Sequence, residues 1–352
     1  MNAMPSQEHA ELTFSSRTVS AKFIDPAGQF VERPLEIRTN PFTGRTCRIA
    51  FSRIKEKEAG TDALPPAPPD ARDTSNCPFC RPQVETQTPQ LNPDLAGEAR
   101  LSCKDSLLFP NLFPYGSYSA VSLFNNDHFV EIGKASPSSY TDSFLNCSRY
   151  LARVIEFDPQ AVYMAITQNH LPSAGGSLIH PHLQINADRV AANHHRFLLE
   201  RANDYFQNSG DYLFSTYLGH ERNDGSRYIG TTGSWEWVAA FAPEGFFEIW
   251  GILPRATSLQ LPEVPDWEDL VQGIINIQRF YRSLNRNGYN MGLLSVEVPS
   301  SRLELRLVIT VRSNYAPWVR SDHTGFEVML GDMTTFVAPE QTAEWARPFF
   351  GL

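Results

Sequence analysis

Residues 178–186 read LIHPHLQIN, and their alternation is typical of a β-strand. It places His180, His182 and Gln184 on one face and apolar side chains on the other. The apolar face is explained by a core, whereas buried imidazoles and amides each need a hydrogen-bond partner. An exposed polar face is the simpler alternative and stays open on this motif alone. The pattern therefore indicates candidate chemistry on the histidine face.

A second candidate is the pair Cys77 and Cys80 in the sequence CPFC. In a reducing compartment this spacing predicts metal binding or redox chemistry more readily than a structural disulfide. Zinc requires four ligands, and His180 and His128 are plausible completions of the set. A cysteine pair without metal remains the alternative.

A glycine-rich turn precedes the histidine strand, in residues 169–177 with the sequence NHLPSAGGS. Gly175, Gly176 and Ser177 could aim backbone N–H groups and a hydroxyl at a phosphate. The same triplet is often only a turn, so its weight comes from its position beside the two histidines.

Composition limits what the protein binds. The chain has 352 residues, with 30 basic and 39 acidic side chains and a net charge of −9. This length predicts about two domains. Without a basic run, nucleic acid and anionic membranes are not expected partners. We expect instead a small anion that a few local groups bind. The sequence also lacks a signal-like start and a membrane-length apolar run, so we expect a cytoplasmic protein.

The elements that must position these residues repeat along the chain. A β-rich segment, a helix and two strands are predicted twice, in residues 107–132, 136–157, 161–168 and 177–187 and then in 235–254, 267–285, 290–298 and 303–312. The repeat predicts an α+β fold of two related halves, with mostly antiparallel sheet and packed helices.

Over residues 40–347 the sequence resembles the galactose-1-phosphate uridylyltransferases of the histidine-triad superfamily. The resemblance is carried by NPFTG at 40–44 with Arg53, by CPFC, by Asn111, by Asp127-His128 and above all by residues 169–184. It implies duplicated triad-like domains, a catalytic half at residues 1–192 and a second half at 193–352.

The resemblance also implies roles. His182 would be the nucleophile that forms a covalent nucleotidyl-histidine, which suits neutral imidazole near pH 7. Gln184 would hydrogen-bond the nucleotidyl group, and one zinc ion would be bound by Cys77, Cys80, His128 and His180. The implied substrate-binding residues are Arg53, Asn111, Asn169, Gly175, Gly176, Ser177, Phe326 and Glu327.

The sequence departs from the family as an atypical member. The strand expected to carry second-metal histidines has Glu304 and Arg306, so we predict no second metal and a charged pair in its place. Leu112 stands where the family has a ribose-binding acid, and Met333 where it has a sugar-reading glutamine. Such changes alter specificity, so we do not expect galactose 1-phosphate with UDP-glucose as the substrate pair.

The sequence thus predicts a zinc-containing nucleotidyltransferase that moves a nucleoside monophosphate from a nucleotide sugar to a sugar phosphate or similar acceptor. A phosphorylase for nucleotide sugars or dinucleoside polyphosphates, with orthophosphate as acceptor, is the nearest alternative. A nucleotide-binding protein without turnover is a third. A homodimer is the family expectation.

Overall fold

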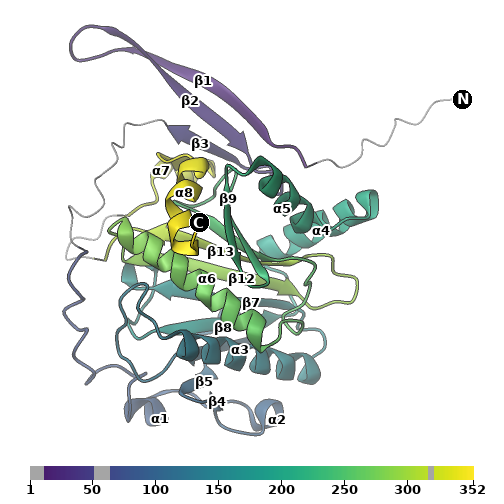
Figure 1. The fold of residues 1–352 in the computed structure, drawn as a ribbon. Helices are drawn as coiled ribbons and strands as arrows, with labels where there is room; N and C mark the ends of the chain where they lie inside the picture. Colours follow the sequence, from purple (N-terminus) through teal and green to yellow (C-terminus); the bar gives the residue numbers. More distant parts are fainter. Residues whose placement is uncertain (1–11, 51–63, 316–320) are drawn as a thin grey trace, which may run out of the picture.

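The structure is a computed structural model that describes residues 12–50, 64–315 and 321–352. Its centre is a ten-stranded sheet with the spatial order β4-β5-β6-β8-β7-β12-β13-β11-β10-β9 (Figure 1). The strands are β4 (Leu101–Cys103), β5 (Ser106–Pro110), β6 (Tyr118–Leu123), β7 (Tyr163–His170), β8 (His182–Asp188), β9 (Tyr228–Thr232), β10 (Trp235–Ala239), β11 (Ile249–Leu253), β12 (Gly288–Val296) and β13 (Leu305–Arg312).

The predicted repeat is confirmed by the topology. The order β5, β6, α3 (Pro137–Phe157), β7, β8 recurs as β10, β11, α6 (Val264–Ser283), β12, β13. All neighbouring strands of this sheet are antiparallel, and the halves meet where β7 pairs with β12 from Tyr289↔His170 to Val296↔Tyr163. The α+β fold is therefore as predicted, and the division at residues 192 and 193, just before α4 (Asn193–Ser209), stays a prediction.

Helices α3 and α6 lie side by side on one face of the sheet (Figure 1). Helix α3 begins after Ser136, whose hydroxyl accepts the N–H of Ser139, and Pro137 occupies the first turn. Tyr140, Phe144, Cys147, Leu151 and Val154 are spaced three or four residues apart and fully or almost fully buried. Phe144 stacks on Trp267 of α6 with ring centroids 5.5 Å apart.

The same core receives the apolar face of β8, because Leu183 and Ile185 are fully buried within it. His182 and Gln184 consequently point to the opposite face of the sheet. In the second half that opposite face is covered by α4 and α5 (Leu213–Asp224), whose Leu198 and Phe214 pack with Trp250. In the first half, a loop covers it instead: Phe79 packs against Phe109 and Val121.

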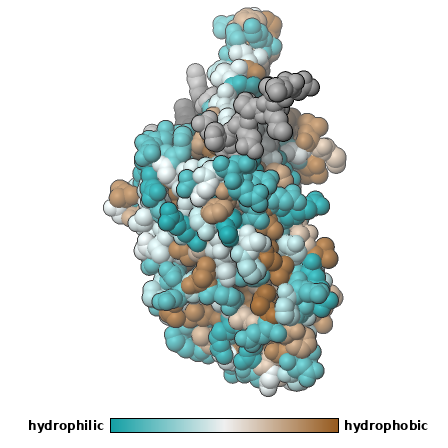
Figure 2. Space-filling view, turned by 90° about the vertical axis from the view of Figure 1, so that its right-hand side faces the viewer, coloured by the Kyte–Doolittle hydropathy of each residue, from teal (hydrophilic) through white to brown (hydrophobic). Residues whose placement is uncertain are grey.

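A smaller sheet has the order β1-β2-β3-β14, with β1 (Ser15–Ile24), β2 (Phe30–Thr39), β3 (Thr46–Ala50) and β14 (Met333–Thr335). The β1–β2 hairpin projects from the body of the molecule (Figures 1 and 2). On the face in Figure 2, apolar and polar side chains are interspersed. The turn at residues 40–44 joins β2 to β3, with Gly44 at φ +68° and the Asn40 side chain accepting the N–H of Phe42.

Short elements complete the described chain: α1 (Gln83–Gln87), α2 (Pro93–Ala96), η1 (Pro172–Ala174), α7 (Gly325–Leu330), α8 (Pro339–Ala346) and η2 (Arg347–Phe350). Helix α8 packs on β10 and β9. None of the helices in the described ranges is long and apolar enough to span a membrane.

Candidate active site and metal centre

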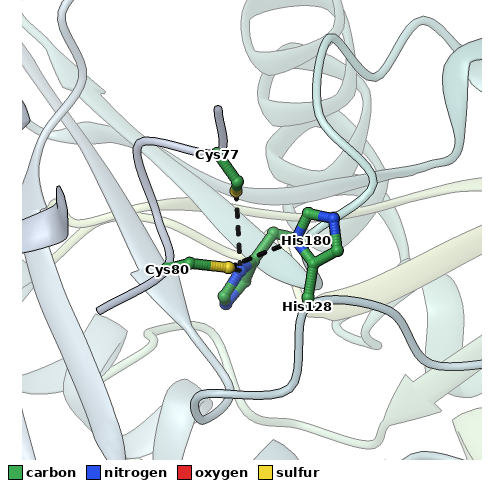
Figure 3. A group of neighbouring side chains, drawn as sticks. All are labelled: Cys77, Cys80, His128 and His180. Atoms are coloured by element: carbon green, nitrogen blue, oxygen red, sulfur yellow. Dashed lines mark hydrogen bonds between the residues drawn. The ribbon is translucent and has the colours of Figure 1, made fainter. Parts of the chain in front are cut away.

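The four predicted metal ligands converge in space (Figure 3). Cys77 and Cys80 come from the loop before α1, His128 from the loop after β6, and His180 from the residues leading into β8. Their ligand atoms all lie within 4.8 Å of one another. Cys80 Sγ is 3.2 Å from His128 Nδ1 and 3.5 Å from His180 Nδ1, and Cys77 Sγ is 3.9 Å from His180 Nδ1.

These separations fit a tetrahedral ion, because zinc with its usual bond lengths holds sulfur and nitrogen ligands about 3.5 Å apart. The imidazoles are also oriented for it. His128 Nε2 lies 3.1 Å from the carbonyl oxygen of Asp70, and His180 Nε2 lies 3.2 Å from that of Asn125. A carbonyl only accepts, so each Nε2 carries the proton and each Nδ1 offers its lone pair to the centre.

The protonation properties of the cluster agree with metal binding. Burial lowers the pKa of His180 to about 4, so its ring is neutral at neutral pH. Burial, with the neighbouring Cys77 adding to it, raises the pKa of Cys80 to about 12. A thiol of this kind gains its anionic form from a bound cation. The cluster is therefore a Cys2His2 site that could hold a metal ion.

His182 begins β8 beside this cluster and is buried. Its Nδ1 lies 2.7 Å from the carbonyl oxygen of His180, so Nδ1 carries the proton and Nε2 keeps a free lone pair. Burial lowers the pKa of His182, against the opposing effect of that hydrogen bond. The ring edge also meets Phe79, with centroids 5.3 Å apart. The geometry gives a neutral imidazole with one available nitrogen.

Gln184 and Asn169 are joined on the same face of the sheet. Asn169 Nδ2 donates to Gln184 Oε1 at 3.1 Å, and Asn169 Oδ1 accepts from Asn290 Nδ2 at 2.6 Å. Asn290 belongs to β12 of the second half and is not among the predicted site residues. The strand register pairs Asn290 with Asn169, a relation across the two halves that local sequence patterns do not contain.

The glycine-rich turn lies at the end of β7, but its donors are arranged differently from the expectation. The N–H groups of Gly175 and Gly176 donate within the turn, to the carbonyls of Pro172 and Leu171. Gly176 is required for close packing, because a Cβ there would lie 2.9 Å from the carbonyl oxygen of Asn169. In the described part of the chain, Ser177 is exposed and its hydroxyl and N–H are not engaged. Ser177 is thus an exposed, unengaged donor of the turn.

Strain and an unpaired nitrogen mark the same turn. Leu171 has φ +70°, a conformation that L-residues rarely adopt and that clusters at functional sites. His170 stacks on Tyr289 at 4.8 Å, and its buried Nε2 has no hydrogen-bond partner among the described residues. Burial, followed by the effect of His182, lowers the pKa of His170 to about 4.

Among the described residues, no hydrogen bond or ring contact joins the other predicted substrate residues to this cluster, and one of them lies outside the described ranges. Arg53 falls among the residues that the structure does not describe. Asn111 follows β5, and its side chain accepts the N–H of Phe113 in a turn, next to the exposed Leu112. Phe326 and Glu327 belong to α7, which contacts β14, and no described contact connects them to His182.

Two local interactions explain the positions of Glu327 and Met333. Glu327 is the acidic member of a capping box and accepts the N–H of Thr324 at 2.7 Å. Met333 is buried with Cys47 and Ile49 in a small core between β14 and β3. In the described chain, therefore, Met333 serves packing, and Glu327 stabilises its own helix.

The predicted charged pair of Glu304 and Arg306 is wrong. Glu304 precedes β13 and accepts the N–H groups of Phe214 and Ser215 at 2.7 and 2.9 Å, so it caps the N-terminus of α5. The Arg306 guanidinium instead lies 4.3 Å from the ring centroid of Trp250. Glu304 therefore caps α5 and Arg306 makes a cation–π contact, so the two side chains have different partners.

No known family model matches the sequence. A relative from Archaeoglobus fulgidus, an uncharacterized protein, is 28% identical over 323 residues, which cover 91% of this chain and 94% of the relative. Among solved structures, a galt-like protein from Arabidopsis thaliana is similar with a TM-score of 0.67 and 20% identity, covering 88% of this chain and 98% of that one.

Two enzymes share the architecture to a comparable degree. An ADP-glucose phosphorylase from Arabidopsis thaliana, solved with bound ADP-glucose, has a TM-score of 0.68 and 21% identity over 89% of this chain and 98% of that one. A uridylyltransferase has a TM-score of 0.64 and 17% identity over 90% and 98%. The chain has the fold of these proteins, which confirms the resemblance at the level of the fold.

Proposed function

We propose that the protein transfers a nucleoside monophosphate from a nucleotide sugar to a phosphorylated acceptor through His182. The observation that carries this proposal is the hydrogen bond from Nδ1 of His182 to the His180 carbonyl, which leaves Nε2 as the nucleophile. Nε2 attacks the α-phosphorus, a P–N bond forms, and the P–O bond to the sugar 1-phosphate breaks. A phosphate oxygen of the acceptor then attacks the same phosphorus, and the P–N bond breaks.

The surrounding residues have supporting roles in this proposal. Gln184 lies on the face of His182 and offers an amide to a non-bridging phosphoryl oxygen. Ser177 offers its hydroxyl and N–H to a phosphate. A zinc ion held by Cys77, Cys80, His128 and His180 would have four protein ligands, which is the composition of structural sites. When bound, zinc supplies rigidity where the chain enters β8.

A second candidate differs only in the acceptor: orthophosphate takes the nucleotidyl group, which makes the enzyme a phosphorylase. The similarity to an ADP-glucose phosphorylase, at a TM-score of 0.68, favours keeping it. Both candidates share the covalent intermediate on His182, so the first experiment tests them together.

The test is intact-mass measurement after incubation with a panel of UDP-, ADP-, GDP- and CDP-sugars and quenching at alkaline pH. We expect a gain of one nucleoside monophosphate with one class of donor, absent in His182→Ala. His220→Ala is the matched control, because His220 is exposed on α5 and stacks on Phe14. Absence of an adduct with every donor would contradict the proposal. Addition of sugar phosphates or orthophosphate to the isolated adduct then identifies the acceptor.

A further inference from the structure

A continuous row of side-chain hydrogen bonds crosses the sheet from the first half to the second. It runs from Gln184 through Asn169 and Asn290 to Arg312, with distances of 3.1, 2.6 and 2.6 Å. The four residues come from β8, β7, β12 and β13, which are adjacent strands of the large sheet. The row therefore connects the predicted catalytic strand to β13 of the second half.

The chemistry of Arg312 fixes the direction of every hydrogen bond in this row. A guanidinium only donates, so the Asn290 atom that meets Arg312 Nη1 is the oxygen. Asn290 Nδ2 then points away and donates to Asn169 Oδ1, and also to the carbonyl oxygen of Ala174 at 2.8 Å. Because a carbonyl only accepts, Ala174 fixes the same orientation of Asn290 independently.

The orientation of the Asn169 amide determines which end of the Gln184 amide faces it. With Asn169 Oδ1 occupied as acceptor, Asn169 Nδ2 donates to Gln184 Oε1. The Gln184 Nε2 group is then the free end of the row, and it has no hydrogen-bond partner among the described residues. Gln184 is only half-buried and lies two residues from His182 on the same strand face. The row ends in two N–H donors beside the proposed nucleophile.

Arg312 is itself held in place. Its Nε and Nη2 donate to both carboxylate oxygens of Asp322 at 2.7 and 2.8 Å, and Asp322 also accepts the N–H of Ser313. Such a two-point pair fixes the plane of the guanidinium, so the remaining Nη1 is directed at Asn290. Asp322 balances the charge of Arg312, and the remaining N–H of Arg312 donates to Asn290 and so fixes which end of the Asn290 amide faces it.

We propose that Arg312 and Asn290 are positioning residues that hold the Gln184 amide with its NH2 group toward the phosphoryl group on His182. This inference rests on the proposed function, because it names what orients Gln184 in that reaction. A reversed amide would present Oε1 to phosphoryl oxygens, and two acceptors repel. The second half, which supplies Asn290 and Arg312, thereby sets the hydrogen-bond polarity of the catalytic strand.

The test uses Asn290→Asp, which keeps the size of the side chain and the contact with Arg312 but removes the donor. Asn169 must then turn its amide to donate to the new carboxylate, and Gln184 must turn its own NH2 inward. We expect at least tenfold slower adduct formation with less than threefold change in donor affinity. Arg312→Met should show a smaller loss, because the Ala174 carbonyl still orients Asn290. Arg312→Lys, which still only donates, should restore most of the rate.

Asn203→Asp is the charge-matched control. Asn203 Oδ1 accepts the N–H of Arg302 at 2.9 Å, an interaction that aspartate retains, and it lies on α4 outside the row. Wild-type rates in Asn290→Asp, or equal loss in Arg312→Lys and Arg312→Met, would overturn the proposal.

A readout that needs no turnover separates this inference from the proposed function. In protein labelled with 15N-glutamine, the side-chain NH2 of Gln184, assigned with Gln184→Asn, should exchange rapidly with water in the wild type. In Asn290→Asp the same NH2 should become protected, because it then donates to Asn169. Equal exchange in both proteins overturns the proposed orientation even if an adduct forms. The predicted exchange difference without an adduct supports the orientation and contradicts only the proposed function.

Discussion

The ring of His182 is oriented by the backbone of His180, whose carbonyl oxygen lies 2.7 Å from Nδ1 of His182. His180 in turn directs its own Nδ1 into the Cys2His2 cluster. The proposed metal binding and the orientation of the proposed nucleophile therefore both depend on one residue. Any change in the backbone at His180 is transmitted directly to His182.

The composition of the cluster predicts the effect of removing one of its proposed ligands. Cys77→Ser should lower zinc content and the melting temperature together, since structural zinc contributes folding free energy. Metal analysis and thermal unfolding of the purified protein measure both. Cys103→Ser is the control, because Cys103 is half-exposed on β4 outside the cluster. Unchanged zinc in Cys77→Ser would exclude Cys77 as a ligand.

Two helical glycines should respond to alanine in opposite directions. A Cβ at Gly273 of α6 would lie 2.0 Å from the Trp237 ring, whereas nothing lies within 4 Å of a Cβ at Gly219 of α5. Gly273→Ala should destabilise the protein by about 2 kcal/mol or more through overpacking. Gly219→Ala should stabilise it by about 0.5–1 kcal/mol through helix propensity. Chemical denaturation measures both, and a shared sign would contradict the described packing.

Glu248 should make stability fall as pH rises. Its carboxylate accepts from Trp250 Nε1 at 2.5 Å and from the Glu244 N–H at 2.7 Å, but burial and then Glu244 raise its pKa to about 7. The folded state thus binds a proton more tightly than the unfolded state between its ordinary pKa of 4.5 and about 7. Stability from this group is complete below pH 4.5 and is lost toward pH 7, by about 3 kcal/mol.

The measurement is the free energy of unfolding from pH 5 to pH 8 for wild type and Glu248→Gln. The amide cannot ionise, so the variant should lose less stability than the wild type across this interval. Parallel curves would show that Glu248 has an ordinary pKa in the folded protein.

Glu340 should stabilise the contact between the two sheets. From α8 it accepts from Arg38 of β2 at 2.8 Å and from Arg227, just before β9, at 2.9 Å. Both arginines are buried and Glu340 is about one-third exposed, so Glu340→Gln should cost about 1–2 kcal/mol at pH 7. Lys22→Gln on the exposed hairpin is the control, since its ion pair with Glu32 is fully at the surface.

The pH dependence supplies a further check on Glu340. Burial raises its pKa, but Arg38 and then Arg227 outweigh burial, and the pKa is lowered below 4.5. Its contribution is therefore present above pH 4.5 and is lost on acidification. The difference between wild type and Glu340→Gln should shrink as the pH falls through this region, and a difference that grows would contradict the assignment.

The alternation of apolar and polar residues predicts much of the fold, and the CPFC spacing with two distant histidines predicts the Cys2His2 cluster. The alternation of residues 178–186 correctly separated buried Leu183 and Ile185 from His182 and Gln184. The pairing of CPFC with two distant histidines was also correct as a juxtaposition. These predictions succeeded because each depends on a local period or on a donor set with a fixed coordination number.

Two of the remaining features depend on contacts between residues that are far apart in the sequence. Asn290 reaches Asn169 only because β7 and β12 pair at that point, and no local pattern contains this information. Strand spacing predicts a pair of Glu304 with Arg306. Glu304 instead accepts N–H groups at the N-terminus of α5, which have no partner within the helix. The N–H groups of Gly175 and Gly176 donate within their own turn, and the composition of the turn does not predict these hydrogen bonds.

The seam between β7 and β12 has a consequence for how such a chain can be divided. Eight register pairs join the halves there, so β7 would be an open edge if the sheet of β4, β5, β6, β8 and β7 existed alone. Open edges associate with other chains at a rate that depends on protein concentration. When the two halves belong to one chain, β12 is always present near β7 at a high effective concentration. Because the two halves belong to one chain, the pairing of β7 with β12 does not depend on protein concentration.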